Sequence, residues 1–315
     1  MPNTSSDNAT SASAATASAT AAQVGGTPVL DAVMTLALAQ AADAAYMDFA
    51  GQTLALPAGW SLIDHWTGWD PDPFGGREER YGLLLGRNDA PGEVIFAFRG
   101  TASLDDALDD ADFPTREFVA TQGAVPTGAL VASGFYGVYN DVGGNMALSM
   151  RAQLTRLLAQ AAPTRIWITG HSLGGALAHL FAFDLSFGPH ASAFHAMISL
   201  ACPRVGLASW RDAYQARIPA ERSIRIYNQH DLVPELPPRD FGFDDVGIGF
   251  PTAFERDLLP DLYPLSRHSL VNLSTVLQHA LPAQPQTWAG TFADARDTQR
   301  EMVSTHPKPP AGQGG

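Results

Sequence analysis

Residues 165–185 read RIWITGHSLGGALAHLFAFDL, and this stretch decides how the chain folds. Its opening residues are mostly apolar, as in a buried strand, and the residues from Ala176 onward predict a helix. Between them, GHSLGG at 170–175 carries the pattern G-x-S-x-G. In a strand–turn–helix context that pattern predicts a sharp turn with the hydroxyl of Ser172 projecting above a sheet. The helix N-terminus behind the turn favours negative charge that develops nearby.

Strand and helix patterns alternate on either side of this stretch. Apolar strands are predicted at 93–98, 165–169, 196–201 and 223–227, and helices at 30–49, 147–162, 176–185 and 270–280. Such alternation predicts an α/β fold with a mostly parallel central sheet flanked by helices. Ligands of such folds bind beyond the carboxyl ends of the strands, so the functional residues are expected there.

The two ends differ in composition from the middle of the chain. Residues 1–26 are rich in Ala, Ser and Thr and hold no Lys or Arg, so we expect a disordered leader rather than a classical secretion signal. Residues 302–315 are rich in Pro and Gly and are expected to be flexible. The folded domain is predicted to span 27–301. This organisation suits the cytoplasm, or export by a route without a classical signal peptide.

Composition excludes several classes of function. The 315 residues include 19 Lys or Arg and 32 Asp or Glu, a formal net charge of −13, which argues against nucleic acid as a partner. Cys202 is the single cysteine, which excludes an intrachain disulfide framework and a multi-cysteine zinc site. No apolar run reaches the roughly 18–20 residues of a membrane-spanning helix.

A serine nucleophile needs a base and a third group that orients the base. In this type of sheet the acid follows the serine in sequence and the histidine comes last. Asp231 lies just past the end of the strand at 223–227 and is the favoured acid. Weaker candidates lie further into the same loop, namely Asp240, Asp244 and Asp245.

Three histidines follow the acid in sequence: His268, His279 and His306. His268 is favoured as the base because it is expected in a loop immediately before the helix at 270–280. His279 lies inside that helical pattern, and His306 lies in the tail. His171 precedes the serine directly, so its side chain should point away from that of Ser172 and serve packing or a hydrogen bond.

The tetrahedral intermediate of such a reaction needs two donors for its oxyanion. One is expected to be the backbone N–H that follows the nucleophile, here that of Leu173. The other should come from the loop after an earlier strand. The strand at 93–98 ends in Arg99-Gly100-Thr101, and the N–H of Thr101 is the candidate.

These residues carry a family resemblance. The chain resembles the class 3, fungal-type lipases of the α/β-hydrolase superfamily from about residue 36 to 277. Six blocks of sequence carry the resemblance: FRGTASLDD at 98–106, SGFY at 133–136, GHSLGG at 170–175, CPRVG at 202–206, NQHDLVPELPP at 228–238 and RHSL at 267–270. The resemblance implies an α/β-hydrolase fold with Ser172 as nucleophile, Asp231 as acid and His268 as base. It also implies an oxyanion hole made by Thr101 and Leu173, with help from the Thr101 hydroxyl.

The chain departs from the family pattern in two places. Ala132 stands where members often carry His, and Ala107 stands where a lid segment usually carries Trp. In residues 104–113, five of the ten are Asp, which leaves little apolar surface for an oil–water interface to stabilise. We expect weak interfacial activation and a preference for shorter or dispersed esters. Alternatively, this acidic stretch is a solvated helix face and residues 243–265 form the lid.

The sequence therefore predicts a carboxylic-ester hydrolase that works through an acyl-enzyme and implies no metal or cofactor. The expected substrate is an ester or lipid, dispersed or at a lipid–water interface, and protein partners are unknown. A phospholipase would use the same three residues. A secreted antibacterial lipase effector and a non-catalytic binding module on a hydrolase scaffold are the other readings of the same sequence.

Overall fold

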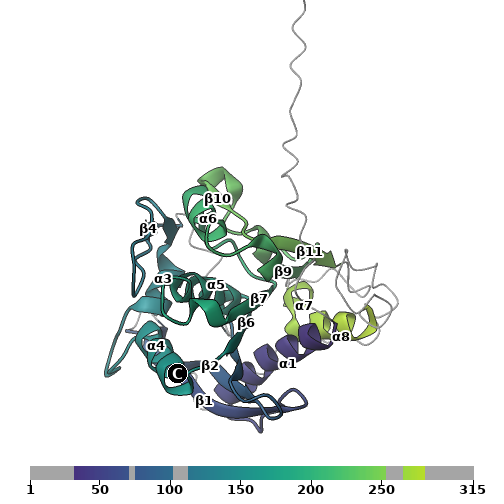
Figure 1. The fold of residues 1–315 in the computed structure, drawn as a ribbon. Helices are drawn as coiled ribbons and strands as arrows, with labels where there is room; N and C mark the ends of the chain where they lie inside the picture. Colours follow the sequence, from purple (N-terminus) through teal and green to yellow (C-terminus); the bar gives the residue numbers. More distant parts are fainter. Residues whose placement is uncertain (1–31, 71–74, 102–112, 253–264, 281–315) are drawn as a thin grey trace, which may run out of the picture.

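The computed structural model describes residues 32–70, 75–101, 113–252 and 265–280. The described part of the chain is built on a seven-stranded sheet (Figure 1). In spatial order its strands are β1 (Trp60–Asp70), β2 (Arg77–Arg87), β3 (Glu93–Phe98), β6 (Arg165–His171), β7 (Phe194–Leu200), β9 (Ser223–Asn228) and β11 (Ile248–Thr252). From β3 to β11 the neighbours pair in parallel, whereas β1 and β2 add an antiparallel edge. The mostly parallel sheet is as predicted. The expected leader and tail lie outside the described residues.

The central strands are apolar because both of their faces are covered. In β3, Val94, Phe96 and Phe98 belong to the hydrophobic cluster on one face of the sheet. Ile95 and Ala97, which alternate with them, belong to the cluster on the other face. A strand buried on two sides reads as a continuous apolar run, which is why 93–98 was recognisable in the sequence.

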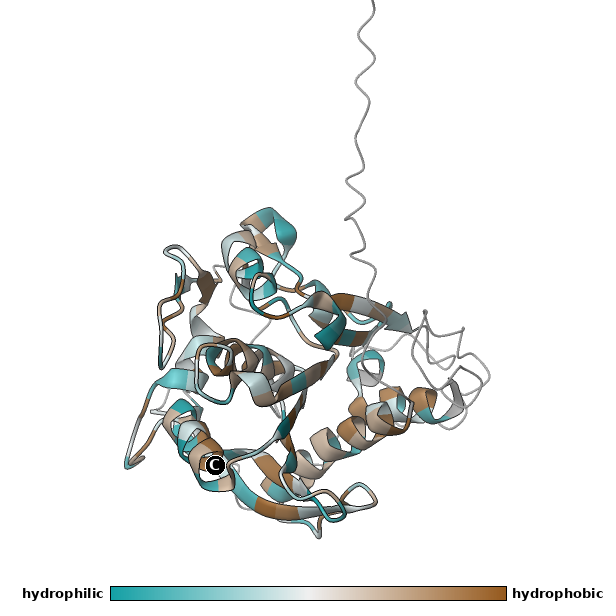
Figure 2. Ribbon diagram, in the orientation of Figure 1, coloured by the Kyte–Doolittle hydropathy of each residue, from teal (hydrophilic) through white to brown (hydrophobic). Residues whose placement is uncertain are grey.

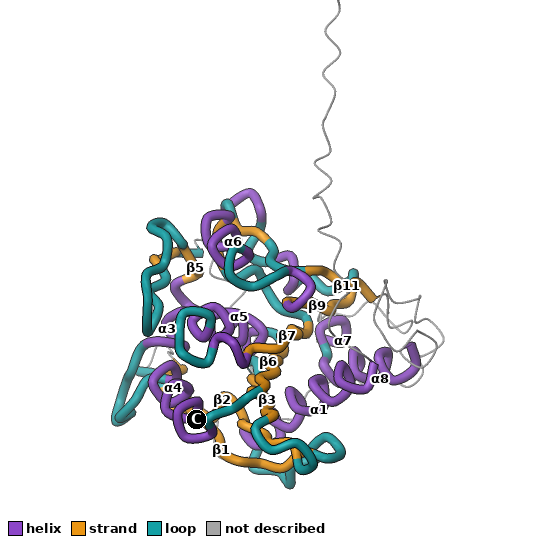
Figure 3. Tube along the Cα trace, in the orientation of Figure 1, coloured by secondary structure: helices purple, strands orange, loops and turns teal. Residues whose placement is uncertain are grey.

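Helices cover both faces of the sheet. On one face α1 (Ala32–Phe49) packs beside α8 (Leu270–Ala280), and Figure 2 shows α1 largely in the brown tones of apolar residues. The other face carries α3 (Ser133–Asn140), α4 (Met150–Ala161), α5 (Leu173–Leu185) and α6 (Ala208–Gln215). The central strands therefore run between α5 and α1 (Figure 3). Within the described ranges, no helix combines the length and apolarity needed to cross a membrane.

A small second sheet was not predicted. Its strands, in the order β10 (Phe243–Asp244), β8 (Gly206–Leu207), β5 (Leu130–Ala132) and β4 (Thr115–Glu117), are two or three residues long, too short to show a periodic pattern. Of the alternative lid at 243–265, residues 243–252 lie in β10, β11 and their connection, with the side chains of Phe243 and Phe250 buried. Residues 253–264 lie outside the described residues.

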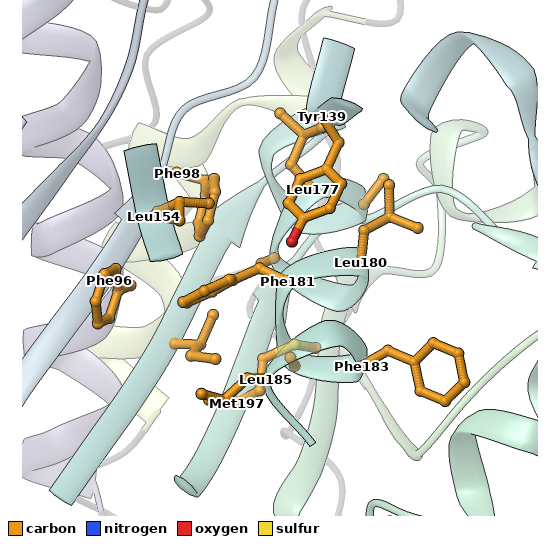
Figure 4. Packing of buried hydrophobic residues seen from close by; sticks show 14 of the residues in the cluster. Phe96, Phe98, Tyr139, Leu154, Leu177, Leu180, Phe181, Phe183, Leu185 and Met197 are labelled. Carbon is orange, nitrogen blue, oxygen red and sulfur yellow. The ribbon is translucent and has the colours of Figure 1, made fainter. Parts of the chain in front are cut away.

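Helix α5 is anchored by aromatic packing. The ring centroid of Phe181 lies 4.9 Å from that of Phe96 and 5.9 Å from that of Phe98, both on β3 (Figure 4). The same helix face meets Leu154 of α4 and Tyr139 of α3 in one cluster. This packing holds α5 against the sheet and so fixes the position of the helix N-terminus, where Ser172 lies.

Replacing Phe181 by Ala should destabilise the protein by about 3–5 kcal/mol, because it leaves a cavity between α5 and β3. The same substitution at Phe241, which is 54% exposed, should cost far less. Denaturant unfolding followed by circular dichroism measures both. Equal losses of stability would contradict the assignment of Phe181 to the core.

A buried histidine on α5 links stability to pH. Burial lowers the pKa of His179 to about 3, and its Nδ1 donates a hydrogen bond to the Gly175 carbonyl at 2.8 Å. Between pH 6.5 and about 3 the unfolded chain therefore binds a proton at this residue that the folded chain excludes. The contribution of His179 to stability falls as pH drops through that window.

Replacing His179 by Asn should flatten the dependence of unfolding free energy on pH. The wild-type protein should lose more stability than the variant between pH 6 and 4, by up to about 1.4 kcal/mol per pH unit. Urea unfolding at a series of pH values gives both curves. Parallel curves would show that His179 is protonated in the folded state.

Candidate active site

Ser172 lies at the turn between β6 and α5, as the sequence predicts. Its backbone has φ 56° and ψ −130°, a conformation that non-glycine residues rarely adopt. The Ser172 N–H donates to the Leu200 carbonyl at 2.9 Å, which ties the turn to β7. A side chain on Gly174 could not be accommodated, since its Cβ would lie 2.5 Å from the Arg99 carbonyl oxygen. Gly174 is therefore required by the close approach of the end of β3, whereas Gly170 is required by the turn itself, since a Cβ there would lie 2.2 Å from the Gly174 carbonyl oxygen.

Asp231 and His268 form a buried pair. Nδ1 of His268 donates to Oδ2 of Asp231 at 2.6 Å, and the two side chains are 2% and 0% exposed. The other oxygen of Asp231 accepts the Val233 N–H at 3.0 Å, so both carboxylate oxygens are held in place. With its Nδ1 proton committed to Asp231, His268 keeps the lone pair on Nε2, the nitrogen that can act as a base.

His268 lies against the serine turn. It was expected in a loop, but it ends a helical turn, α7 (Leu265–His268), just before α8. Its ring centroid lies 4.7 Å from that of His171, the residue before Ser172. The structure thus brings the three residues selected from the sequence to one place. Ser172 is 1% exposed, and its hydroxyl has no hydrogen-bond partner among the described residues.

The expected oxyanion donors lie on either side of Ser172. A Cβ on Gly100 would lie 2.8 Å from the Ser172 Cβ, so the Gly100–Thr101 backbone runs directly beside the serine. Leu173 is the first residue of α5, and the first N–H groups of a helix have no partner in its own hydrogen-bond ladder. Two backbone N–H groups beside a serine suit the stabilisation of a tetrahedral oxyanion.

Arg99 is buried directly beside the Thr101 loop. Its role was not apparent from the sequence, where it is part of the block at 98–106. Its guanidinium carbon lies 3.8 Å from the ring centroid of Phe49 and 4.3 Å from that of Tyr81. Nη2 forms an ion pair with Oε2 of Glu79 at 2.5 Å. The side chain of Arg99 is fully buried and that of Glu79 is 7% exposed, so Glu79 compensates a buried charge. The other oxygen of Glu79 pairs with the half-exposed Arg77.

The same guanidinium orients the Thr101 peptide. Nη1 of Arg99 donates to the Gly100 carbonyl at 2.5 Å. The Gly100 C=O and the Thr101 N–H belong to one trans peptide plane and point in opposite directions. By holding the carbonyl, Arg99 fixes the direction of the Thr101 N–H.

Other predicted features are placed only in part. Of the lid segment 104–113, only Phe113 is described, and its ring centroid lies 5.7 Å from that of Phe241. Ala132, one departure from the family pattern, ends β5 and is buried. Within the described ranges, no group of three His, Cys, Asp or Glu residues has the arrangement of a metal site.

Comparison with protein families agrees with this geometry. Residues 95–241 match the family model described as "Lipase (class 3)". Over these residues the chain is similar to the class 3 lipase family. This match confirms the resemblance seen in the sequence. The matched segment includes Ser172, Asp231 and both expected oxyanion donors, and it ends before His268.

The curated relatives of this chain carry two kinds of name. "Phospholipase A1-II 4" of Oryza sativa subsp. japonica is 32% identical over 189 residues, which cover 55% of this chain and 45% of the relative. "Lipase" of Rhizopus niveus is 32% identical over 166 residues, 51% of this chain and 39% of the relative. The chain thus spans less than half the length of these relatives.

Solved structures confirm the α/β-hydrolase fold. The lipase of Rhizopus microsporus var. chinensis superposes with a TM-score of 0.53 at 24% identity, covering 72% of this chain and 78% of that one. The LIP2 lipase of Yarrowia lipolytica gives a TM-score of 0.54 at 23% identity, covering 71% and 80%.

Replacing Arg99 by Met should destabilise the protein by about 3 kcal/mol, because it removes the buried partner of Glu79 and leaves that carboxylate only its pair with the half-exposed Arg77. Arg87, whose pair with Asp89 lies at the surface, is the matched control, and its replacement by Met should cost less than about 1 kcal/mol. Thermal and urea unfolding measure both. An Arg99 variant as stable as the control would contradict a structural ion pair.

Proposed function

We propose that this protein hydrolyses carboxylic esters of fatty acids, with Ser172 as the nucleophile. The observation that carries the proposal is the buried Asp231–His268 pair, joined at 2.6 Å and packed against the strained turn of Ser172. A serine beside an oriented imidazole is the arrangement that activates a hydroxyl for attack on a carbonyl carbon.

In the first half of the reaction His268 removes the hydroxyl proton through Nε2 while Oγ of Ser172 attacks the ester carbonyl carbon. The carbonyl oxygen becomes an oxyanion that accepts hydrogen bonds from the N–H groups of Thr101 and Leu173. The intermediate then collapses, the ester C–O bond breaks, and His268 gives its proton to the departing alcohol. The product is an acyl-enzyme on Ser172.

In the second half a water molecule takes the place of the alcohol. His268 accepts a proton from this water, which attacks the acyl carbon. The bond between that carbon and Oγ of Ser172 then breaks, His268 returns the proton to Oγ, and the fatty acid leaves. Asp231 stays ionised, orients the imidazole and stabilises its charged form in both halves. Each proton transfer in this scheme uses a residue of this chain.

The first substrate class we propose is acylglycerols. Apolar side chains are exposed in the segment that follows Asp231, with Leu232 at 59% and Phe241 at 54%, and they suit the acyl part of such an ester. Phospholipids are the second candidate, favoured by the relative named phospholipase A1. The acidic segment 104–113 supports a preference for shorter or dispersed esters over an oil–water interface.

Hydrolysis of p-nitrophenyl esters from acetyl to palmitoyl tests the proposal. The wild-type protein should be active and peak at short chains, and Ser172→Ala should lower kcat by at least about a thousandfold. Ser186→Ala, at the opposite end of α5, is the control and should keep wild-type activity. If activity instead peaked at the palmitoyl ester and was lost in Ser172→Ala, Ser172 would remain the proposed nucleophile, but the short-chain preference would be rejected.

Two further measurements complete this test. An active-serine phosphonate should add covalently to Ser172, located by peptide mass mapping, and to no residue of Ser172→Ala. Trioleoylglycerol and phosphatidylcholine, offered in matched micelles, then decide between the two substrate classes. Undiminished hydrolysis by Ser172→Ala would reject Ser172 as the nucleophile, and absence of phosphonate labelling in the wild-type protein would favour a binding module.

A further inference from the structure

Tyr46 of α1 reaches into the proposed active site from outside the matched family segment 95–241. The residue is 3% exposed, and its hydroxyl oxygen accepts the Gly100 N–H at 2.9 Å. The same oxygen lies 2.8 Å from Nδ1 of His171. One hydroxyl thus contacts both the residue before Thr101 and the residue before Ser172.

The chemistry of these groups sets the direction of each bond. The Gly100 N–H can only donate, so the Tyr46 oxygen accepts from it. The carbonyl oxygen of His268 can only accept, so Nε2 of His171 carries a proton, and Nδ1 of the neutral ring is left to accept the proton of the Tyr46 hydroxyl. That Nε2 is 2.9 Å from the carbonyl oxygen of His268, to which it donates.

The result is a chain of three hydrogen bonds that all run the same way, from Gly100 through Tyr46 and His171 to His268. It joins three segments that are far apart in the sequence: the loop of the Thr101 donor, the turn of Ser172 and the segment of the base. His268 is therefore held twice, at its ring by Asp231 and at its carbonyl by His171. Packing of the His171 ring against that of His268 supports the same arrangement.

The chain is protected from exchange with water. Tyr46 is nearly inaccessible and His171 is fully buried, and burial raises the pKa of the tyrosine hydroxyl well above its ordinary value. Gly100 has no room for a side chain, since a Cβ there would lie 2.5 Å from the Tyr46 oxygen. At neutral pH the Tyr46 hydroxyl therefore stays protonated and hydrogen-bonded to both Gly100 and His171.

We propose that Tyr46 and His171 are positioning residues that set the distance between the oxyanion donor Thr101 and the base His268. The proposal rests on the proposed ester hydrolysis and deepens it. Neither side chain touches the ester. Both act by fixing groups that must lie on opposite sides of the reacting carbon at the same moment, and small displacements of such groups are costly for the rate.

Tyr46→Phe removes the hydroxyl and keeps the ring. It should lower kcat for a soluble p-nitrophenyl ester about 10- to 100-fold while KM changes less than about threefold, because the ester makes no contact with Tyr46. Tyr139→Phe is the matched control, since it removes another buried hydroxyl. Tyr139 lies on α3, and its hydroxyl donates to Asp184 of α5 at 2.9 Å. The control should keep kcat whatever its effect on the melting temperature.

Substitutions at His171 test the direction of the chain. Gln offers an acceptor for Tyr46 and a donor for the His268 carbonyl, so His171→Gln should retain kcat within about fivefold of wild type. Leu offers neither, so His171→Leu should lose as much as Tyr46→Phe. The double variant Tyr46→Phe with His171→Leu should lose no more than either single variant, because each breaks the same chain.

The outcomes separate the two proposals. A wild-type protein without esterase activity, or an undiminished Ser172→Ala variant, would overturn the proposed function itself. If Ser172→Ala is inactive while Tyr46→Phe and His171→Leu both keep wild-type kcat, only the positioning role is overturned. An equal loss of kcat in Tyr139→Phe would also overturn it. Should Tyr46→Phe fail to fold, the contrast between Gln and Leu at position 171 decides the question.

Discussion

The whole arrangement depends on the close approach of β3 to the turn after β6. The backbone at Arg99 lies so near Gly174 that a single methyl group there would overlap with it. This contact brings the end of β3 beside Ser172, which is what makes Gly100 and Thr101 part of the site. Parallel pairing of β3 with β6 sets the register of the approach, with Phe98 opposite Gly170.

The residues that the sequence identified are those whose position follows from local rules. Ser172 follows a buried strand and opens a helix, and Asp231 follows the end of β9. Apolar runs such as 93–98 mark strands buried on both faces, so the centre of the sheet was predictable. The edge was not, because β1 has register shifts near Leu62 and Trp66 that break the two-residue period on which a strand prediction depends.

The supporting residues could not be found from the sequence for a related reason. The buried position of Arg99 depends on its ion pair with Glu79, which lies on the unpredicted strand β2. The position of the Tyr46 hydroxyl depends on its hydrogen bond to His171, 125 positions away in the sequence. Nothing local distinguishes Tyr46 from any other aromatic residue on an Ala-rich helix. Only the folded chain shows that its hydroxyl meets the Gly100 N–H.

The order of elements along the chain has a consequence during synthesis. Ser172 leaves the ribosome long before His268, and α8, which packs beside α1, comes later still. Because the proposed base and its carbonyl contact arrive with the last described segment, a nascent chain would display Ser172 without the group proposed to deprotonate it. The proposed reactive centre therefore depends on contacts between the first and last described segments, and a chain that ends before His268 is expected to be inactive.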